Sequence, residues 1–78
     1  MEYIAVFFTH SGALKYNKFL KNKDIPAQLM PVPRKLSSNC GIGIQFNYSS
    51  DINTIISEDI EKIFSIEGKE SKLVYACD

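Results

Sequence analysis

The sequence predicts an α+β fold in which one antiparallel sheet of four strands carries two helices on one face. Two observations predict it. Short apolar segments rich in β-branched and aromatic residues alternate with two segments of helical apolar spacing, in the order β-α-β-β-α-β. The chain also has only 78 residues, which suits a single domain over residues 1–78. One small sheet with two helices on one face buries both apolar stripes at once.

The first strand and helix are the clearest elements. Residues 3–8 are apolar and aromatic, as is typical of a buried central strand. Thr9 or Ser11 can cap the helix that follows, because a hydroxyl there accepts a hydrogen bond from an orphan backbone N–H. We expect this helix to run from about residue 12 to residue 23, with one face formed by Ala13, Tyr16, Phe19 and Leu20.

Two strands follow. Residues 27–30 form a short extended segment, and the prolines at 31 and 33 confine it to a sheet edge or end it. Residues 41–46 alternate small or polar side chains with apolar ones, so that Ile42, Ile44 and Phe46 face one side. The glycines at positions 41 and 43 indicate a bulge or a close approach of another backbone.

The second half supplies the second helix and the last strand. A helix is expected to begin near residues 49–51, or after a break at residues 57–59, and to extend to Phe64. Its apolar stripe would hold Ile52, Ile55, Ile56, Ile60, Ile63 and Phe64. Residues 73–77 form the last strand. The ferredoxin-like fold is the compact solution for this order of elements, with strand order four, one, three, two.

This topology predicts where the two cysteines lie. The first strand ends where the third begins, so Thr9, His10, Ser11 and Cys40 should share one end of the sheet. Cys77 should lie at the opposite end, about 17–20 Å away. A Cys40–Cys77 disulfide is then disfavoured, since its α-carbons must lie within about 7 Å.

Cys40 has the neighbours of a working thiol, namely glycine, serines and a basic pair. Arg34 and Lys35 would favour the thiolate, His10 can orient or deprotonate it, and Ser37, Ser38 and the Gly41 amide can donate hydrogen bonds to it. A simpler interpretation stays open for each residue: Cys40 as an inert thiol, His10 as a loop or capping residue, and the others as solvated charges and turn formers.

Composition excludes several classes of function. With two cysteines and one histidine, and no Cys-x-x-Cys pair, we expect no metal and no bound cofactor. The longest uncharged run is too short for a membrane span and lacks signal-peptide features, which predicts a cytoplasmic protein. Residues 1–39 carry a net charge of +4 and residues 40–78 a net charge of −4. This excess is small for nucleic-acid binding but could help dock an acidic partner.

The run from Phe7 to Leu20, together with the motif Pro-x-Pro-Arg-x-x-Ser-Ser-x-Cys-Gly over residues 31–41, resembles a family of small bacterial selenium/sulfur carrier-like proteins. The resemblance covers residues 3–48 best. It implies a carrier in which Cys40 holds the atom as a persulfide or selenosulfide. A donor such as a cysteine desulfurase, or a selenium-handling protein, would supply the atom and an acceptor enzyme would receive it. A carrier of this kind is not an enzyme in the sense of turnover.

The alternative is a small binding or regulatory module in which Cys40 has no covalent role. Ferredoxin-like domains often dimerise through the sheet, and a two-helix layer covers only one side of it. We therefore expect a homodimer through the exposed sheet face, because Ala5, Phe7, Ile44 and Tyr75 should not all point at the helices.

Overall fold

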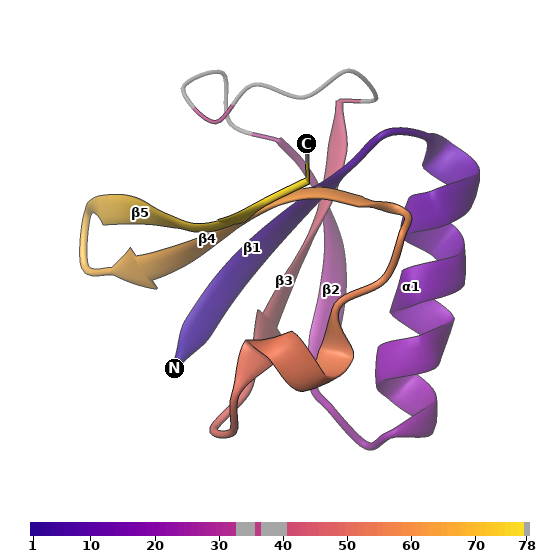
Figure 1. The fold of residues 1–78 in the computed structure, drawn as a ribbon, viewed down its shortest axis with the longest axis horizontal. Coiled ribbons are helices and arrows are strands. Elements are labelled where there is room, and N and C mark those ends of the chain that lie inside the picture. The colour runs from indigo at the N-terminus through magenta and orange to yellow at the C-terminus, as the bar shows by residue number, and fades with distance from the viewer. Residues whose placement is uncertain (33–35, 37–40, 78) are drawn as a thin grey trace.

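A computed structural model describes residues 1–32, 36 and 41–77 of the chain. Within these residues, five strands form one sheet of order β2-β3-β1-β4-β5, and every neighbouring pair is antiparallel (Figure 1). The elements are β1 (Glu2–Phe7), α1 (His10–Asn22), β2 (Ala27–Pro31), β3 (Ile42–Asn47), the 3₁₀ helix η2 (Ile52–Ile55), β4 (Ile60–Glu67) and β5 (Glu70–Ala76).

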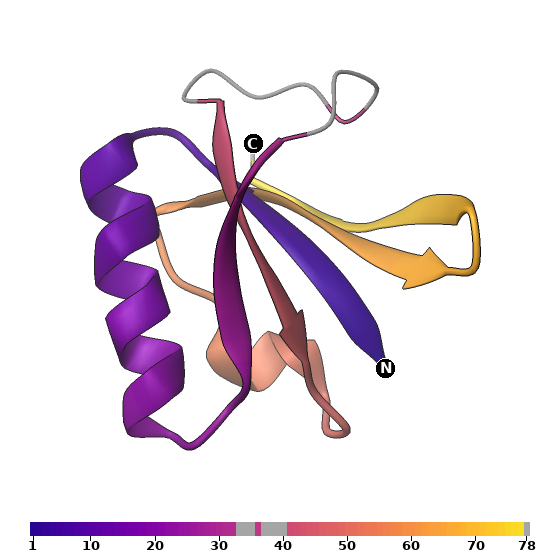
Figure 2. The same cartoon turned by 180° about the vertical axis from the view of Figure 1, so that it is seen from behind.

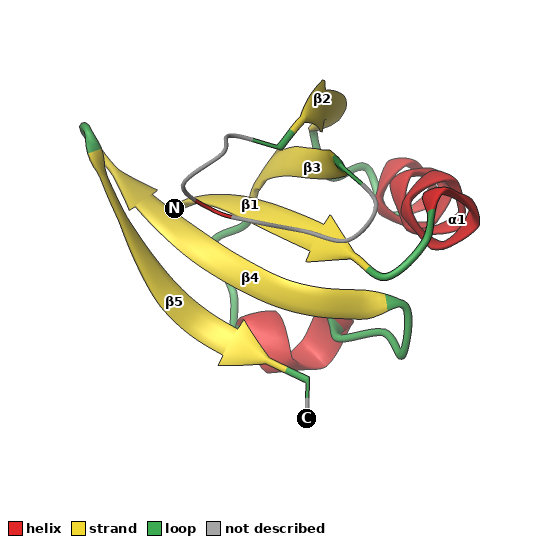
Figure 3. Cartoon of the chain, turned by 90° about the horizontal axis from the view of Figure 1, so that it is seen from above, coloured by secondary structure: helices red, strands yellow, loops and turns green. Residues whose placement is uncertain are grey.

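The main core lies between the sheet and α1. α1 packs against β2, β3 and β1, while the β4–β5 hairpin extends away from the helix (Figures 1 and 2). Tyr3, Ala5 and Phe7 of β1 point into this core, and the aromatic rings of Phe7 and Tyr16 lie 5.5 Å apart. Ile52 and Ile55 of η2 complete the layer, so the short 3₁₀ helix covers part of the face that α1 leaves open (Figure 3).

A smaller cluster occupies the other face of the sheet. Ile4 and Val6 of β1 point into it, and Leu36, only 4% exposed, packs against them. β1 is therefore buried on both faces. The expectation that Ala5, Phe7, Ile44 and Tyr75 divide between two faces is wrong, since all four pack into the main core. A homodimer through the sheet face stays a prediction.

The ferredoxin-like prediction of four strands and two helices is wrong. In the described residues one α-helix is present, and the segment expected to be the second helix forms η2, a turn and β4. The Asp51 side chain accepts a hydrogen bond from the Asn53 amide, which starts only a single 3₁₀ turn. The Ser57 hydroxyl then accepts from the Asp59 amide at 3.2 Å, a local bond that competes with helix formation.

A bulge explains why the strand β4 has the apolar spacing of a helix. β1 pairs Val6 with Lys62 but Phe7 with Ile60, so Glu61 is an extra residue in β4. Ile60 and Ile63 are three residues apart, yet both point into the main core. Phe64, which the helical pattern placed beside Ile63, points to the opposite face and packs with the smaller cluster.

The position predicted for Cys77 is also wrong. Because β4 occupies the place next to β1, the last strand β5 runs parallel to β1 and not antiparallel to it. Gly43, Val6, Lys62 and Ala76 form one row across the sheet, so Gly41 and Cys77 lie at the same end. Gly43 and Ala76, at the two ends of that row, are three strand spacings apart, or roughly 14 Å. That Cys40 and Cys77 form no disulfide stays a prediction.

Ser65 offers a direct test of β4, because it is 4% exposed in the sheet, whereas the expected helix ended one residue before it and gave it no buried place. We expect Ser65→Lys to lower the free energy of unfolding by more than about 2 kcal/mol, since it buries an unpaired charge. Ser50→Lys, at an exposed position, is the matched control. Equal urea midpoints for the two variants would contradict the strand.

Tyr16 joins α1 to η2, since its buried hydroxyl donates a 2.6 Å hydrogen bond to the carbonyl of Ile55. Burial raises the pKa of Tyr16 well above its ordinary value of about 10, and the nearby Tyr48 raises it further. The unfolded chain therefore releases this proton first as pH rises, so stability is retained below about pH 10 and falls above it.

Tyr16→Phe should cost about 1 kcal/mol near neutral pH, because the Ile55 carbonyl loses its buried partner. The deficit should shrink above about pH 10, because the variant has no such proton to lose. Urea unfolding of both proteins at about pH 8 and about pH 11 measures this. A deficit that stays constant or grows with pH would rule out the linkage.

Candidate functional site

The segment that holds the predicted thiol leaves the sheet between β2 and β3. Its two stems are held together, because the Val32 amide donates a 3.1 Å hydrogen bond to the Gly41 carbonyl, one step beyond the pair Pro31–Ile42. Gly41 has a φ of +71°, a conformation that glycine adopts without strain. Cys40 directly precedes Gly41 in the chain. The sheet therefore holds the residue after the thiol in a defined position.

Gly43 permits a close approach beside this stem. The sequence predicted a bulge or close approach at both Gly41 and Gly43, but at Gly41 an added Cβ atom would meet nothing within 4 Å. A Cβ atom at position 43 would lie 2.9 Å from the carbonyl oxygen of Ala5 and 3.2 Å from Cγ2 of Val32. Val32 therefore occupies the space that a side chain at position 43 would fill. This contact brings the β2 stem over β3, toward the smaller apolar cluster that Val32 joins.

His10 and Gly41 border the same surface hollow. His10 is the exposed first residue of α1, and Gly41 is the exposed residue that begins the return into β3. The hollow has a volume of about 370 Å³ and is lined by His10, Leu29, Met30, Pro31, Gly41 and Ile42. Its walls are mainly apolar, and it is open to solvent.

The other predicted site residues, Arg34, Ser37, Ser38 and Cys40, lie outside the described residues, as does Lys35. The structure thus places two of the six predicted site residues, His10 and Gly41, and brings them to one hollow. The action of His10 on the Cys40 thiol stays a prediction.

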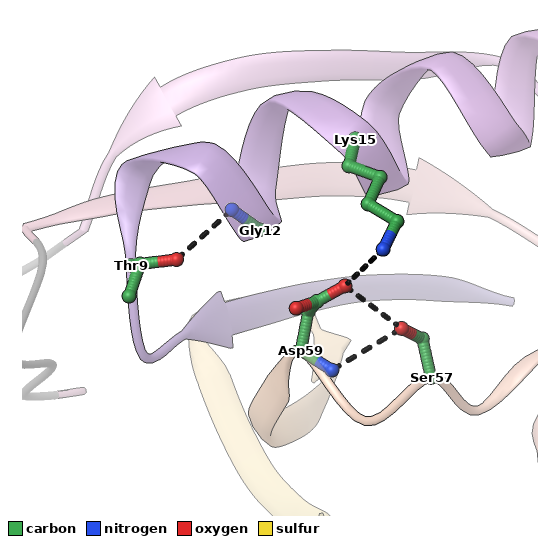
Figure 4. A network of polar contacts seen from close by, with 5 residues as sticks. All are labelled: Thr9, Gly12, Lys15, Ser57 and Asp59. Atoms are coloured by element: carbon green, nitrogen blue, oxygen red, sulfur yellow. Dashed lines mark hydrogen bonds and ion pairs between the residues drawn. The ribbon is translucent and has the colours of Figure 1, made fainter.

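The first turn of α1 is anchored to the turn before β4 (Figure 4). Thr9 caps the helix, because its hydroxyl accepts a 3.0 Å hydrogen bond from the Gly12 amide. Asp59 lies against this turn: its carbonyl accepts from the Phe8 amide at 3.4 Å, and its carboxylate lies 3.7 Å from Nζ of Lys15. The ion pair is largely exposed, so it contributes less than about 1 kcal/mol. The backbone and cap contacts do most to position His10.

Gly12 and Asp59 are positioning residues that the sequence did not reveal. A Cβ atom at position 12 would lie 2.9 Å from the Cβ of Asp59, so only glycine lets the helix come this close. The spacing of Ser57 and Asp59, in which one side chain bonds the other's amide, was the available sign of a turn there. Their contact with Gly12 depends on tertiary structure.

The described residues form neither a metal cluster nor a membrane-spanning helix. Within residues 1–32, 36 and 41–77, no three His, Cys, Asp or Glu side chains gather closely enough to hold a metal ion. The helix that these residues form is too short and too polar to span a bilayer.

The fold and this site define a small antiparallel sheet domain in which Gly41, the residue after Cys40 in the chain, borders the same hollow as His10 at the start of α1. Residues 2–68 match the model of the family described as "Putative Se/S carrier protein-like". The matched range covers most of the chain and includes Cys40, so the chain belongs to this family. No curated protein and no solved structure matches it.

Gly12→Ala tests the anchoring of α1. Alanine favours a helix by up to about 1 kcal/mol over glycine, but here its methyl group would push against Asp59. We expect a net loss of about 1 kcal/mol or more in the free energy of unfolding. Ser11→Ala, at the exposed neighbouring position, should change it by less than about 0.5 kcal/mol. A more stable Gly12→Ala protein would show that the two segments are not in contact.

Proposed function

We propose that this protein carries sulfur or selenium on Cys40, as a persulfide or selenosulfide, between a donor protein and an acceptor enzyme. Membership of the Se/S carrier-like family, over a range that includes Cys40, is the observation that carries the proposal. A cysteine desulfurase is the expected class of sulfur donor, because it holds the transferable atom as a persulfide. The chemistry needs a reduced thiol, which suits the cytoplasm.

The transfer is a thiol–persulfide exchange. The Cys40 thiolate attacks the outer sulfur of the donor's persulfide, a new sulfur–sulfur bond forms on Cys40, and the donor leaves as a thiolate that takes up a proton. The oxidation level of the transferred atom is unchanged, so no oxidant or reductant is consumed. The acceptor then receives the atom from Cys40 by the same displacement.

The described surroundings support this role. A carrier must offer its thiol to two different active sites, which favours a small rigid body over a deep pocket. The hydrogen bond between Val32 and Gly41 fixes the base of the thiol-bearing segment on the sheet. The shallow, mainly apolar hollow that His10 and Gly41 border offers a partner a contact surface beside the base of this segment.

Cys40→Ser should abolish loading. Purified protein is incubated with a cysteine desulfurase and cysteine, and its intact mass is measured without reductant. The unmodified chain should gain one sulfur atom, Cys40→Ser should gain none, and Cys77→Ser should gain it as the unmodified chain does. Loading that survives in Cys40→Ser would overturn the assignment.

Alkylation distinguishes the alternative, a binding module without covalent chemistry. A thiol with a lowered pKa reacts with iodoacetamide at mildly acidic pH, where an ordinary thiol is slow. Rapid alkylation of Cys40 relative to Cys77 in the same molecule supports the carrier. Slow alkylation of both, with no gain of sulfur, would favour the binding module.

A further inference from the structure

One exposed face of α1 leads directly away from the hollow that His10 and Gly41 border. His10, Leu14, Lys18 and Lys21 are spaced by four, four and three residues, so they share one face of the helix. All four are exposed, and Leu14, at 56%, is a large apolar side chain open to solvent. At 1.5 Å per residue, this row begins at the hollow and extends about 16 Å along the helix. We call it the α1 row.

The charge of this helix is entirely positive. α1 and its C-cap contain Lys15, Lys18, Lys21 and Lys23, and no acidic residue lies between His10 and Lys23. Lys15 is engaged with Asp59 on the adjoining flank, and Lys23 lies over the Phe19 ring at 5.3 Å. Lys18 and Lys21 therefore give the α1 row its charge, in a chain whose net charge is zero.

We propose that the α1 row is the docking surface for an acidic surface of the protein that loads Cys40. This inference rests on the carrier function proposed above. The reacting groups of the transfer, a thiolate and a persulfide, are both anions, so their approach is opposed by like charge. Lysines along the row, paired with carboxylates on the partner, attract the partner to this side of the molecule and steer the encounter. Leu14 supplies an apolar contact between the thiol end and the two lysines.

The composition of the α1 row favours a protein partner over a nucleic acid or an anionic bilayer. Nucleic-acid binding generally uses a larger basic excess, and a bilayer surface is bound by a helix with a broad apolar face. Here two lysines accompany a single exposed leucine, a composition that suits a small protein interface with a polar rim.

The test compares two sulfur donors. Rates of Cys40 loading are measured by intact mass, with a cysteine desulfurase and with glutathione persulfide, a small donor that needs no docking surface. We expect the double variant Lys18→Glu/Lys21→Glu to lower the ratio of the enzymatic rate to the small-donor rate about tenfold at low salt. The effect should largely vanish at about 0.5 M salt, where exposed charges are screened.

Two variants sharpen the result. Lys69→Glu/Lys72→Glu reverses two equally exposed lysines on the β4–β5 hairpin and should leave the ratio near that of the unmodified chain. Leu14→Ala should lower the ratio at both salt concentrations, because its contact is apolar. Thermal unfolding of each variant confirms that it is folded.

The outcomes separate the two proposals. If neither donor loads the unmodified chain, the carrier function fails and this inference fails with it. If both donors load it and the α1 variants keep the ratio, the docking surface alone is refuted. Salt-sensitive binding of the unmodified chain to single-stranded DNA or to phosphatidylglycerol vesicles, lost in the double variant while the ratio is kept, would assign the row to that polyanion instead.

Discussion

Burial of β1 on both of its faces is the constraint on which the other elements depend. Tyr3, Ala5 and Phe7 require one apolar layer, while Ile4 and Val6 require another. One helix of 13 residues covers only part of a sheet of this width, so the chain supplies the rest from shorter pieces. Ile52 and Ile55 of η2 extend the helical layer, and Leu36 closes the opposite face. A second helix is not needed once these pieces are in place.

The same constraint positions the candidate site. β1 ends at Phe7, and the chain turns immediately through Thr9 into α1, so His10 must lie at that end of the sheet. β3 pairs with β1 in the antiparallel direction, which brings Gly41 to the same end. Gly12 and Gly43 permit the two close approaches that hold these segments down. The end of the sheet is therefore rigid on both sides of the point where the thiol-bearing segment begins.

Under the proposed function, a closely packed base for the segment that contains Cys40 suits a carrier. Transfer between proteins requires the sulfur to enter another active site, and the ordering cost of that encounter is lower when the surrounding surface is already formed. The α1 row begins at the hollow and continues along the helix, so the proposed docking would give such an encounter a direction.

The local sequence by itself determined β1, the capped helix α1, the edge strand β2 and the inward residues of β3, because each of these has one clear period and a recognisable start or end. The run from Phe7 to Leu20, together with the motif around Cys40, indicated the family that the match over residues 2–68 shows. Because β1 pairs with β3, His10 and Gly41 lie at the same end of the sheet and border one hollow.

Only the tertiary structure decided the secondary structure of residues 51–67, which form η2, a turn and β4 in place of a helix. Ile60 and Ile63 have helical spacing, and it takes the bulge against Val6 and Phe7 to place both on one side of a strand. A bulge depends on the neighbouring strand, so no local pattern reveals it. The position of Cys77 has the same cause. Because β4 lies next to β1, β5 pairs with β4 and runs in the direction opposite to the one expected for the last strand. Pairing with a distant strand therefore overrode the local preference for a helix, because the apolar spacing of this segment fits both a helix and a bulged strand.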